Sequence, residues 1–76
     1  MMNKHYTDLT IEPLNVMQAW FNEDELRGFL RGNIIKYIAR YRNKNGIEDL
    51  EKARDYLNKL IEHEQRIYDN LLDEIL

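Results

Sequence analysis

The apolar residues of the chain recur at helical spacing in three separate stretches. In the first stretch, Leu14, Met17 and Trp20 lie three residues apart and follow Pro13, a residue that is favoured at the first position of a helix. This pattern predicts a short helix over residues 13–20. We expect Trp20 to be an anchor of the core, and the alternative is a platform on which a ligand stacks.

A second helix is predicted over residues 23–42. Asn22 followed by Glu25 is the signature of an N-cap with its capping-box partner, and the acidic residues of the first turn suit the helix dipole. The apolar face of this helix comprises Leu30, Ile34, Ile38 and Tyr41. Gly28 and Gly32 lie four residues apart within it. Either another backbone or a ligand approaches closely there, or the helix breaks near Gly32.

The longest apolar stripe follows the turn at Asn45-Gly46, which favours positive φ and ends the second helix. It predicts a third helix over residues 47–74, with a heptad-like pattern that Glu64 interrupts. Such a helix is about 40 Å long, whereas a compact chain of this size has a radius of gyration of about 11 Å. The last turns must therefore project, or the helix must break near His63, which we expect to be exposed or in an interface. A projecting apolar stripe needs a partner, so we expect a homo-oligomer.

The composition fits a single all-α domain over residues 1–76, built from a short first helix and a helical hairpin. The chain is 33% charged, with one proline and three glycines, and a chain this short buries only about 60% of its unfolded surface. It has no cysteine, which excludes disulfides and thiolate metal sites and leaves self-association as the expected source of further stability. No apolar run has the length of a membrane-spanning helix or a signal peptide, so we expect a cytoplasmic protein without a membrane partner.

Positive charge is concentrated in residues 26–47, which hold six Lys/Arg residues and no acid although the net charge of the chain is −3. Asn33, Lys36, Tyr37 and Arg40 fall at positions i, i+3, i+4 and i+7 and therefore share one helix face. An amide, an ammonium, a phenol and a guanidinium in a row suit a phosphate or carboxylate ligand. The alternative is a solvated basic face on an ordinary core helix.

Other candidate chemistry surrounds this basic face. Residues 1–10 form a polar arm, in which His5 and Tyr6 are the side chains able to reach over the face and cap a bound nucleotide. Glu48 and Asp49 could hold Mg²⁺, but carboxylates in the first turn of a helix more often serve the helix dipole, so no metal site is predicted. The net negative charge argues against nucleic acid as a partner and favours a small, pocket-sized anion.

Four motifs occur in an order that resembles a known family. They are His5-Tyr6, then Ile11-Glu12-Pro13 with Val16 and Ala19-Trp20, then Gly32-Asn33-Ile34-Ile35-Lys36-Tyr37-Ile38-Ala39-Arg40, and then Glu48-Asp49-Leu50-Glu51-Lys52-Ala53-Arg54-Asp55-Tyr56-Leu57. Together they resemble a small phage-encoded domain of unknown function that is often described as a nucleotide kinase. That description comes from a longer podophage deoxynucleotide kinase that carries the domain. The resemblance covers about residues 5 to 61.

The resemblance implies a helical phage protein that handles nucleotides in an infected bacterial cell. Carried over residue by residue, it implies a ligand site made of His5, Tyr6, Asn33, Lys36, Tyr37 and Arg40, with Lys44 as a weaker member. It indicates no catalytic residue in this chain. We expect no cofactor, except that Mg²⁺ would accompany kinase activity.

Three functions follow as hypotheses. The first is an oligomeric protein that binds and sequesters a nucleotide or a nucleotide-derived signalling molecule, as some phage counter-defence proteins do. The second is a deoxynucleoside monophosphate kinase or a related phosphotransfer enzyme that uses Mg²⁺. The third is a module whose third helix binds and inhibits a host protein.

Overall fold

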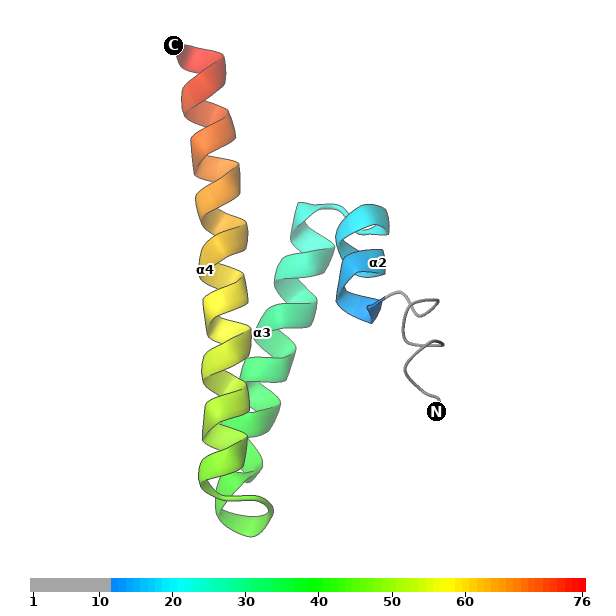
Figure 1. The fold of residues 1–76 in the computed structure, drawn as a ribbon, viewed down its shortest axis with the longest axis vertical. Helices are drawn as coiled ribbons and strands as arrows, with labels where there is room; N and C mark the ends of the chain where they lie inside the picture. Colours follow the sequence, from blue (N-terminus) through cyan, green and yellow to red (C-terminus); the bar gives the residue numbers. More distant parts are fainter. Residues whose placement is uncertain (1–11) are drawn as a thin grey trace, which may run out of the picture.

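The computed structural model describes residues 12–76 and shows a helical hairpin with a short helix beside it (Figure 1). Helix α2 spans Pro13–Trp20, α3 spans Glu23–Arg40, the 3₁₀ turn η1 spans Tyr41–Asn43, and α4 spans Ile47–Ile75. The described residues are thus all-helical, with a long C-terminal helix, as the apolar pattern predicted. The arm at residues 1–10, with His5 and Tyr6, lies outside the described part.

Helix α3 begins with the capping box that the sequence predicted. The Asn22 side chain accepts a hydrogen bond from the Glu25 backbone at 2.8 Å, and the Glu25 carboxylate accepts one from the Asn22 backbone at 2.9 Å. The helix then passes through Gly32 without interruption, so the alternative of a break near Gly32 is wrong. An ideal Cβ placed at Gly28 or Gly32 would meet no atom within 4 Å, so no described segment approaches either glycine closely.

The turn after α3 reverses the chain so that α4 runs antiparallel to α3 (Figure 1). Gly46 has φ of +59° and ψ of −126°, a backbone conformation that side-chain-bearing residues avoid. Its N–H donates to the Tyr41 carbonyl at 2.8 Å, which closes the turn. Regular α-helix ends at Arg40, and the two residues predicted beyond it belong to the tighter 3₁₀ turn.

The core lies between α3 and α4 and is thin. In the described part of the chain, the buried apolar residues are Leu26, Leu30 and Ala53. His63 is also buried, and its Nε2 makes a hydrogen bond of 3.1 Å with the Glu23 carbonyl at the start of α3. The expectation that His63 is exposed or in an interface between copies is therefore wrong. The ring fills the space where the first turn of α3 meets α4.

Arg27 joins the first turns of α3 to the middle of α4. Its Nε and Nη2 donate to the two carboxylate oxygens of Glu64 at 2.5 and 2.9 Å, and its Nη1 donates to Asp24 at 2.7 Å. The hydrogen bonds from Arg27 hold the pKa of Glu64 below its ordinary value. This ion pair explains why the charged residue Glu64 interrupts the apolar pattern of α4.

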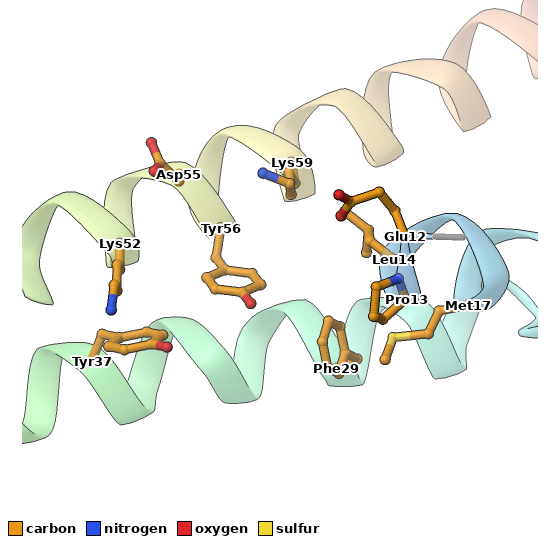
Figure 2. Close-up of a pocket in the computed structure, with 10 residues that line it drawn as sticks. All are labelled: Glu12, Pro13, Leu14, Met17, Phe29, Tyr37, Lys52, Asp55, Tyr56 and Lys59. Carbon is orange, nitrogen blue, oxygen red and sulfur yellow. The ribbon is translucent and has the colours of Figure 1, made fainter. Parts of the chain in front are cut away.

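Trp20 does not anchor the core, because its side chain is 80% exposed. Helix α2 has only two turns and no buried residue, and it directs Leu14 and Met17 toward α3 and α4 (Figure 2). Trp20 ends this helix and lies off that face. The periodicity identified the helix correctly, but it could not tell which of its apolar residues are covered.

Helix α4 continues as one straight helix well past the end of the hairpin (Figure 1). It has 29 residues against 18 in α3, and none of the residues after His63 is buried. The radius of gyration is 15.7 Å, above the value of about 11 Å for a compact chain of this length. The projection of the last turns is thus confirmed, and the break near His63 does not occur. In the described part, no helix has the length and apolar character that a membrane span requires.

Candidate ligand-binding pocket

A pocket opens where α2 meets the hairpin (Figure 2). Its volume is about 430 Å³, within the size range of small-molecule sites. All three helices contribute to the lining, which comprises Glu12, Pro13, Leu14, Met17, Phe29, Tyr37, Lys52, Asp55, Tyr56 and Lys59. The pocket therefore combines apolar, aromatic and charged side chains.

Three aromatic rings form the floor of this pocket. Tyr37 from α3 and Tyr56 from α4 lie nearly parallel, with ring centroids 5.9 Å apart and an angle of 16° between the planes. Phe29 meets Tyr56 edge-on, at 6.1 Å and 74°. Figure 2 shows Tyr56 reaching from α4 between the two α3 rings. Because the rings come from both helices of the hairpin, forming the hairpin assembles the floor.

Cations gather around Tyr37 at one end of the pocket. The Nζ of Lys36 lies 4.6 Å from the ring centroid, the guanidinium carbon of Arg40 lies 4.8 Å away, and the Nζ of Lys52 lies 5.6 Å away. Lys59 holds its Nζ 5.8 Å from the centroid of Tyr56. All four distances are within the range of cation–π attraction, so the rings position the positive charges.

Arg40 has a second role in the fold. Its Nε and Nη2 donate to the two carboxylate oxygens of Asp49, each at 3.3 Å. Asp49 is fully buried, and it also accepts a hydrogen bond from the Asn45 backbone at 3.1 Å. Burial raises the pKa of Asp49, but the hydrogen bonds from Arg40 and Asn45 outweigh it, so the net pKa lies below its ordinary value. Asp49 therefore offsets much of the charge of Arg40, whereas Lys36 and Lys52 form no salt bridge with another residue of the described range 12–76.

The opposite end of the pocket is apolar. Pro13, Leu14 and Met17 of α2 lie there against Phe29 (Figure 2). Two carboxylates also line the pocket, Glu12 beside Leu14 at the α2 end and Asp55 on α4 (Figure 2). The pocket thus has a cationic end at Tyr37 and an apolar end at α2. This polarity suits a ligand that has an anionic group at one end and a flat apolar or heteroaromatic group at the other.

The structure brings only some of the predicted site residues together. Lys36 and Arg40 both lie over the ring of Tyr37, but of these three residues only Tyr37 lines the pocket itself. The Asn33 amide instead donates to the Phe29 carbonyl of its own helix at 2.9 Å. Lys44 is exposed in the turn beyond α3. His5 and Tyr6, which were predicted to cap the pocket, lie outside the described residues.

Sequence reasoning missed the contribution of α4 and of Phe29. Lys52, Tyr56 and Lys59 occupy positions i, i+4 and i+7 of α4 and therefore share one face of that helix. This spacing was a usable signal, because the three residues are a positively charged and aromatic stripe in an otherwise acidic helix. Phe29 gave no comparable signal, since an apolar residue in a helix is expected to serve the core.

The geometry defines the class of protein: a small all-helical hairpin protein with a pocket lined by aromatic rings and lysines. A family model described as a protein of unknown function, DUF3310, matches residues 2–58, and the chain belongs to this family. The match includes α2, α3 and the first part of α4, and with them every described lining residue of the pocket except Lys59. Searches of curated proteins and of solved structures found no match.

Proposed function

We propose that this protein binds a nucleotide or a nucleotide-derived signalling molecule and holds it without converting it. The observation that carries the proposal is the polarity of the pocket, with lysines beside Tyr37 at one end and Phe29 with α2 at the other. The phosphate lies at the cationic end, near Lys52, the pocket-lining lysine beside Tyr37. The base lies on the rings of the floor, where stacking contributes about 1–3 kcal/mol per base.

Sequestration fits this pocket better than phosphotransfer does. Asp49, the strongest candidate for a Mg²⁺ ligand in α4, is buried and already engaged by Arg40 and Asn45. A kinase would also have to place a second nucleotide next to the first. The remaining functional predictions belong to this proposal as well: a phage origin, a counter-defence role in the bacterial cytoplasm, and an assembly of several copies.

The proposal is tested by calorimetric titration of the full chain with three probes: a cyclic dinucleotide, ADP-ribose and a deoxynucleoside monophosphate. We expect at least one probe to bind. Lys52→Ala should then weaken it about tenfold or more, because a charge-assisted hydrogen bond contributes about 1.5–3 kcal/mol. Tyr56→Leu should weaken it through lost stacking.

Arg31→Ala is the matched control, since Arg31 is an exposed cation of α3 that does not line the pocket. It should leave the affinity unchanged. Equal losses in Lys52→Ala and Arg31→Ala would mean that the ligand is held by general charge and not by the pocket. Wild-type protein that binds none of the three probes would overturn the proposal.

Chromatography of the bound probe after incubation with Mg²⁺ and ATP separates sequestration from catalysis. We expect the probe to be recovered unchanged. Recovery of a phosphorylated product would identify the protein as a phosphotransfer enzyme. Native mass spectrometry of protein purified from a nucleotide-rich extract complements this test, because it reports the mass of any ligand that the protein retained.

A further inference from the structure

Helix α4 carries two stripes of mainly apolar residues, and among residues 12–76 only one of them packs against another helix. The inward stripe contains the buried residues of α4, which are Asp49, Ala53 and His63, and it faces α3. The outward stripe has the same alternation of three- and four-residue steps, but its register is offset by one residue, so it is turned by about 100° around the helix. It contains Ile47, Leu50, Leu57, Ile61, Tyr68 and Leu71, each at least 36% exposed. A second heptad stripe on a helix that is already packed indicates another helix as its partner.

The outward stripe also contains two charges, Arg54 and Glu64, at heptad positions between the apolar residues. Their order favours one orientation of a second copy of the chain. In a parallel, in-register pair, Arg54 would face Arg54 and Glu64 would face Glu64, which is repulsive. In an antiparallel pair related by a two-fold axis beside residue 59, Arg54 faces Glu64 of the second copy, and the reverse holds by symmetry.

The same axis matches each of these six apolar residues with another of the six. Leu57 meets Ile61 of the second copy, and Leu50 meets Tyr68. Ile47, at the first turn of α4, meets Leu71 near its end. A shift of one heptad in either direction would place Arg54 against Leu57 or Leu71 and bury its charge without a partner, which is costly. The charge pair therefore selects the register as well as the orientation.

The surface is hollowed where a partner side chain would enter. A depression of about 420 Å³ is lined by Leu57, Leu60, Ile61 and Glu64, with Gln65 and Tyr68 beside them. The first four residues are at positions i, i+3, i+4 and i+7, which is the four-residue hole that receives a knob in coiled-coil packing. Both carboxylate oxygens of Glu64 accept hydrogen bonds from Arg27, but the side chain is still 46% exposed, so a second guanidinium can reach it.

We propose that the outward stripe of α4 is the docking surface for a second copy of this chain, which binds antiparallel with Arg54 of each copy on Glu64 of the other. This inference does not rest on the proposed function. The pocket residues Lys52, Tyr56 and Lys59 project from a different face of α4 than the stripe does. The dimer therefore leaves both pockets open.

Cysteine pairs test the orientation directly, because the sequence contains no cysteine of its own. Leu50→Cys and Tyr68→Cys are made as separate full-length proteins, mixed and oxidised. We expect a disulfide between the two variants and none within either variant alone, since only the mixed pair brings the two Cα atoms to within about 7 Å. Leu50→Cys that crosslinks to itself would indicate a parallel pair and overturn the proposal. Glu62→Cys, on another face of α4, is the control and should not crosslink.

Charge reversal tests the pairing of Arg54 with Glu64. Arg54→Glu and Glu64→Arg should each raise the dissociation constant of the dimer at least about tenfold in sedimentation experiments, because like charges then face each other. An equimolar mixture should restore dimers, since both contacts become complementary. Circular dichroism checks that each variant is folded, because Glu64→Arg also removes the ion pair between Glu64 and Arg27.

Wild-type protein that stays monomeric at all accessible concentrations would overturn the proposal. So would dimers that both reversals leave unaffected, since a different surface would then form them.

Discussion

At the scale of single residues, Asp49 and Arg40 show how one contact can belong to both the fold and the site. Asp49 is a fully buried charged residue in the first turn of α4, and Arg40 is the last residue of α3. Their ion pair therefore joins the two helices beside the turn. The same guanidinium lies over Tyr37 at the cationic end of the pocket. Removing Arg40 would leave the fully buried Asp49 without its cation, which costs more than the pair contributes, whereas Arg40 is 34% exposed and can be solvated without Asp49.

The depressed pKa of Asp49 makes the stability of the hairpin sensitive to acid. A carboxylate whose pKa is lower in the folded state contributes stability above its unfolded pKa, and this contribution is lost as the pH falls through the folded pKa. We expect the free energy of unfolding to fall as the pH is lowered below the ordinary Asp value of 3.8. Glu64, whose pKa is also depressed, acts in the same direction.

Urea titrations followed by circular dichroism at several pH values measure this effect. Asp49→Asn should lower stability at neutral pH and flatten the pH dependence in the acid range. Asp73→Asn, at an exposed position near the end of α4, should leave both nearly unchanged. An unaltered acid slope in Asp49→Asn would show that another carboxylate governs the transition.

At the scale of elements, the turn after α3 needs the backbone freedom of glycine, whereas α3 itself does not. Gly46 adopts positive φ, where a side chain is strained, and it closes the turn through its hydrogen bond to Tyr41. Gly32 has ordinary helical geometry, and a Cβ there would meet open space. The turn requires its glycine, whereas the helix tolerates one.

The two positions therefore form a matched pair of alanine substitutions. Gly46→Ala should destabilise the protein by about 1–3 kcal/mol, the cost of an unfavourable backbone conformation. Gly32→Ala should stabilise it by about 0.5–1 kcal/mol, because alanine favours the helix. Chemical denaturation of both variants measures the difference. A destabilised Gly32→Ala would reveal that another molecule approaches α3 closely at this position.

At the scale of the whole molecule, the hairpin has little interior. Its described core consists of three buried apolar residues, while large apolar side chains of α4 remain exposed. A chain of this length gains less from burial than a larger domain does. Association that covers the outward stripe of α4 would add buried apolar area at about 25 cal/mol per Å². Folding and assembly should therefore be coupled.

This coupling makes thermal stability depend on protein concentration. We expect the Tm to rise steadily as the concentration is increased, because the folded state is the one that associates. Differential scanning calorimetry over a wide concentration range measures the shift. Arg54→Glu should lower the Tm at a given concentration if the outward stripe is the interface, because the weakened dimer then needs a higher concentration to form. A Tm independent of concentration in the wild type would mean that the hairpin is stable alone.

The sequence predicted the elements well and their surroundings less well. Three features could be predicted because each depends on residues that are near in sequence: the capping box at Asn22, the turn at Gly46 and the projecting end of α4. Trp20 and His63 were placed wrongly, because burial depends on what another helix brings to the position. The chain buries a histidine and exposes its tryptophan, which is the reverse of what hydropathy favours.

The same division applies to the pocket. The sequence by itself determined that Lys36, Tyr37 and Arg40 share one face of α3, since this follows from helical geometry alone. The tertiary structure decided that Lys52 and Tyr56 of α4 meet them, that Phe29 continues the floor, and that Asp49 offsets Arg40. Periodicity fixes which side chains lie on one face of a helix. Only the packing of two helices fixes which faces meet, because that depends on the turn, the crossing of the helices and the groups buried between them.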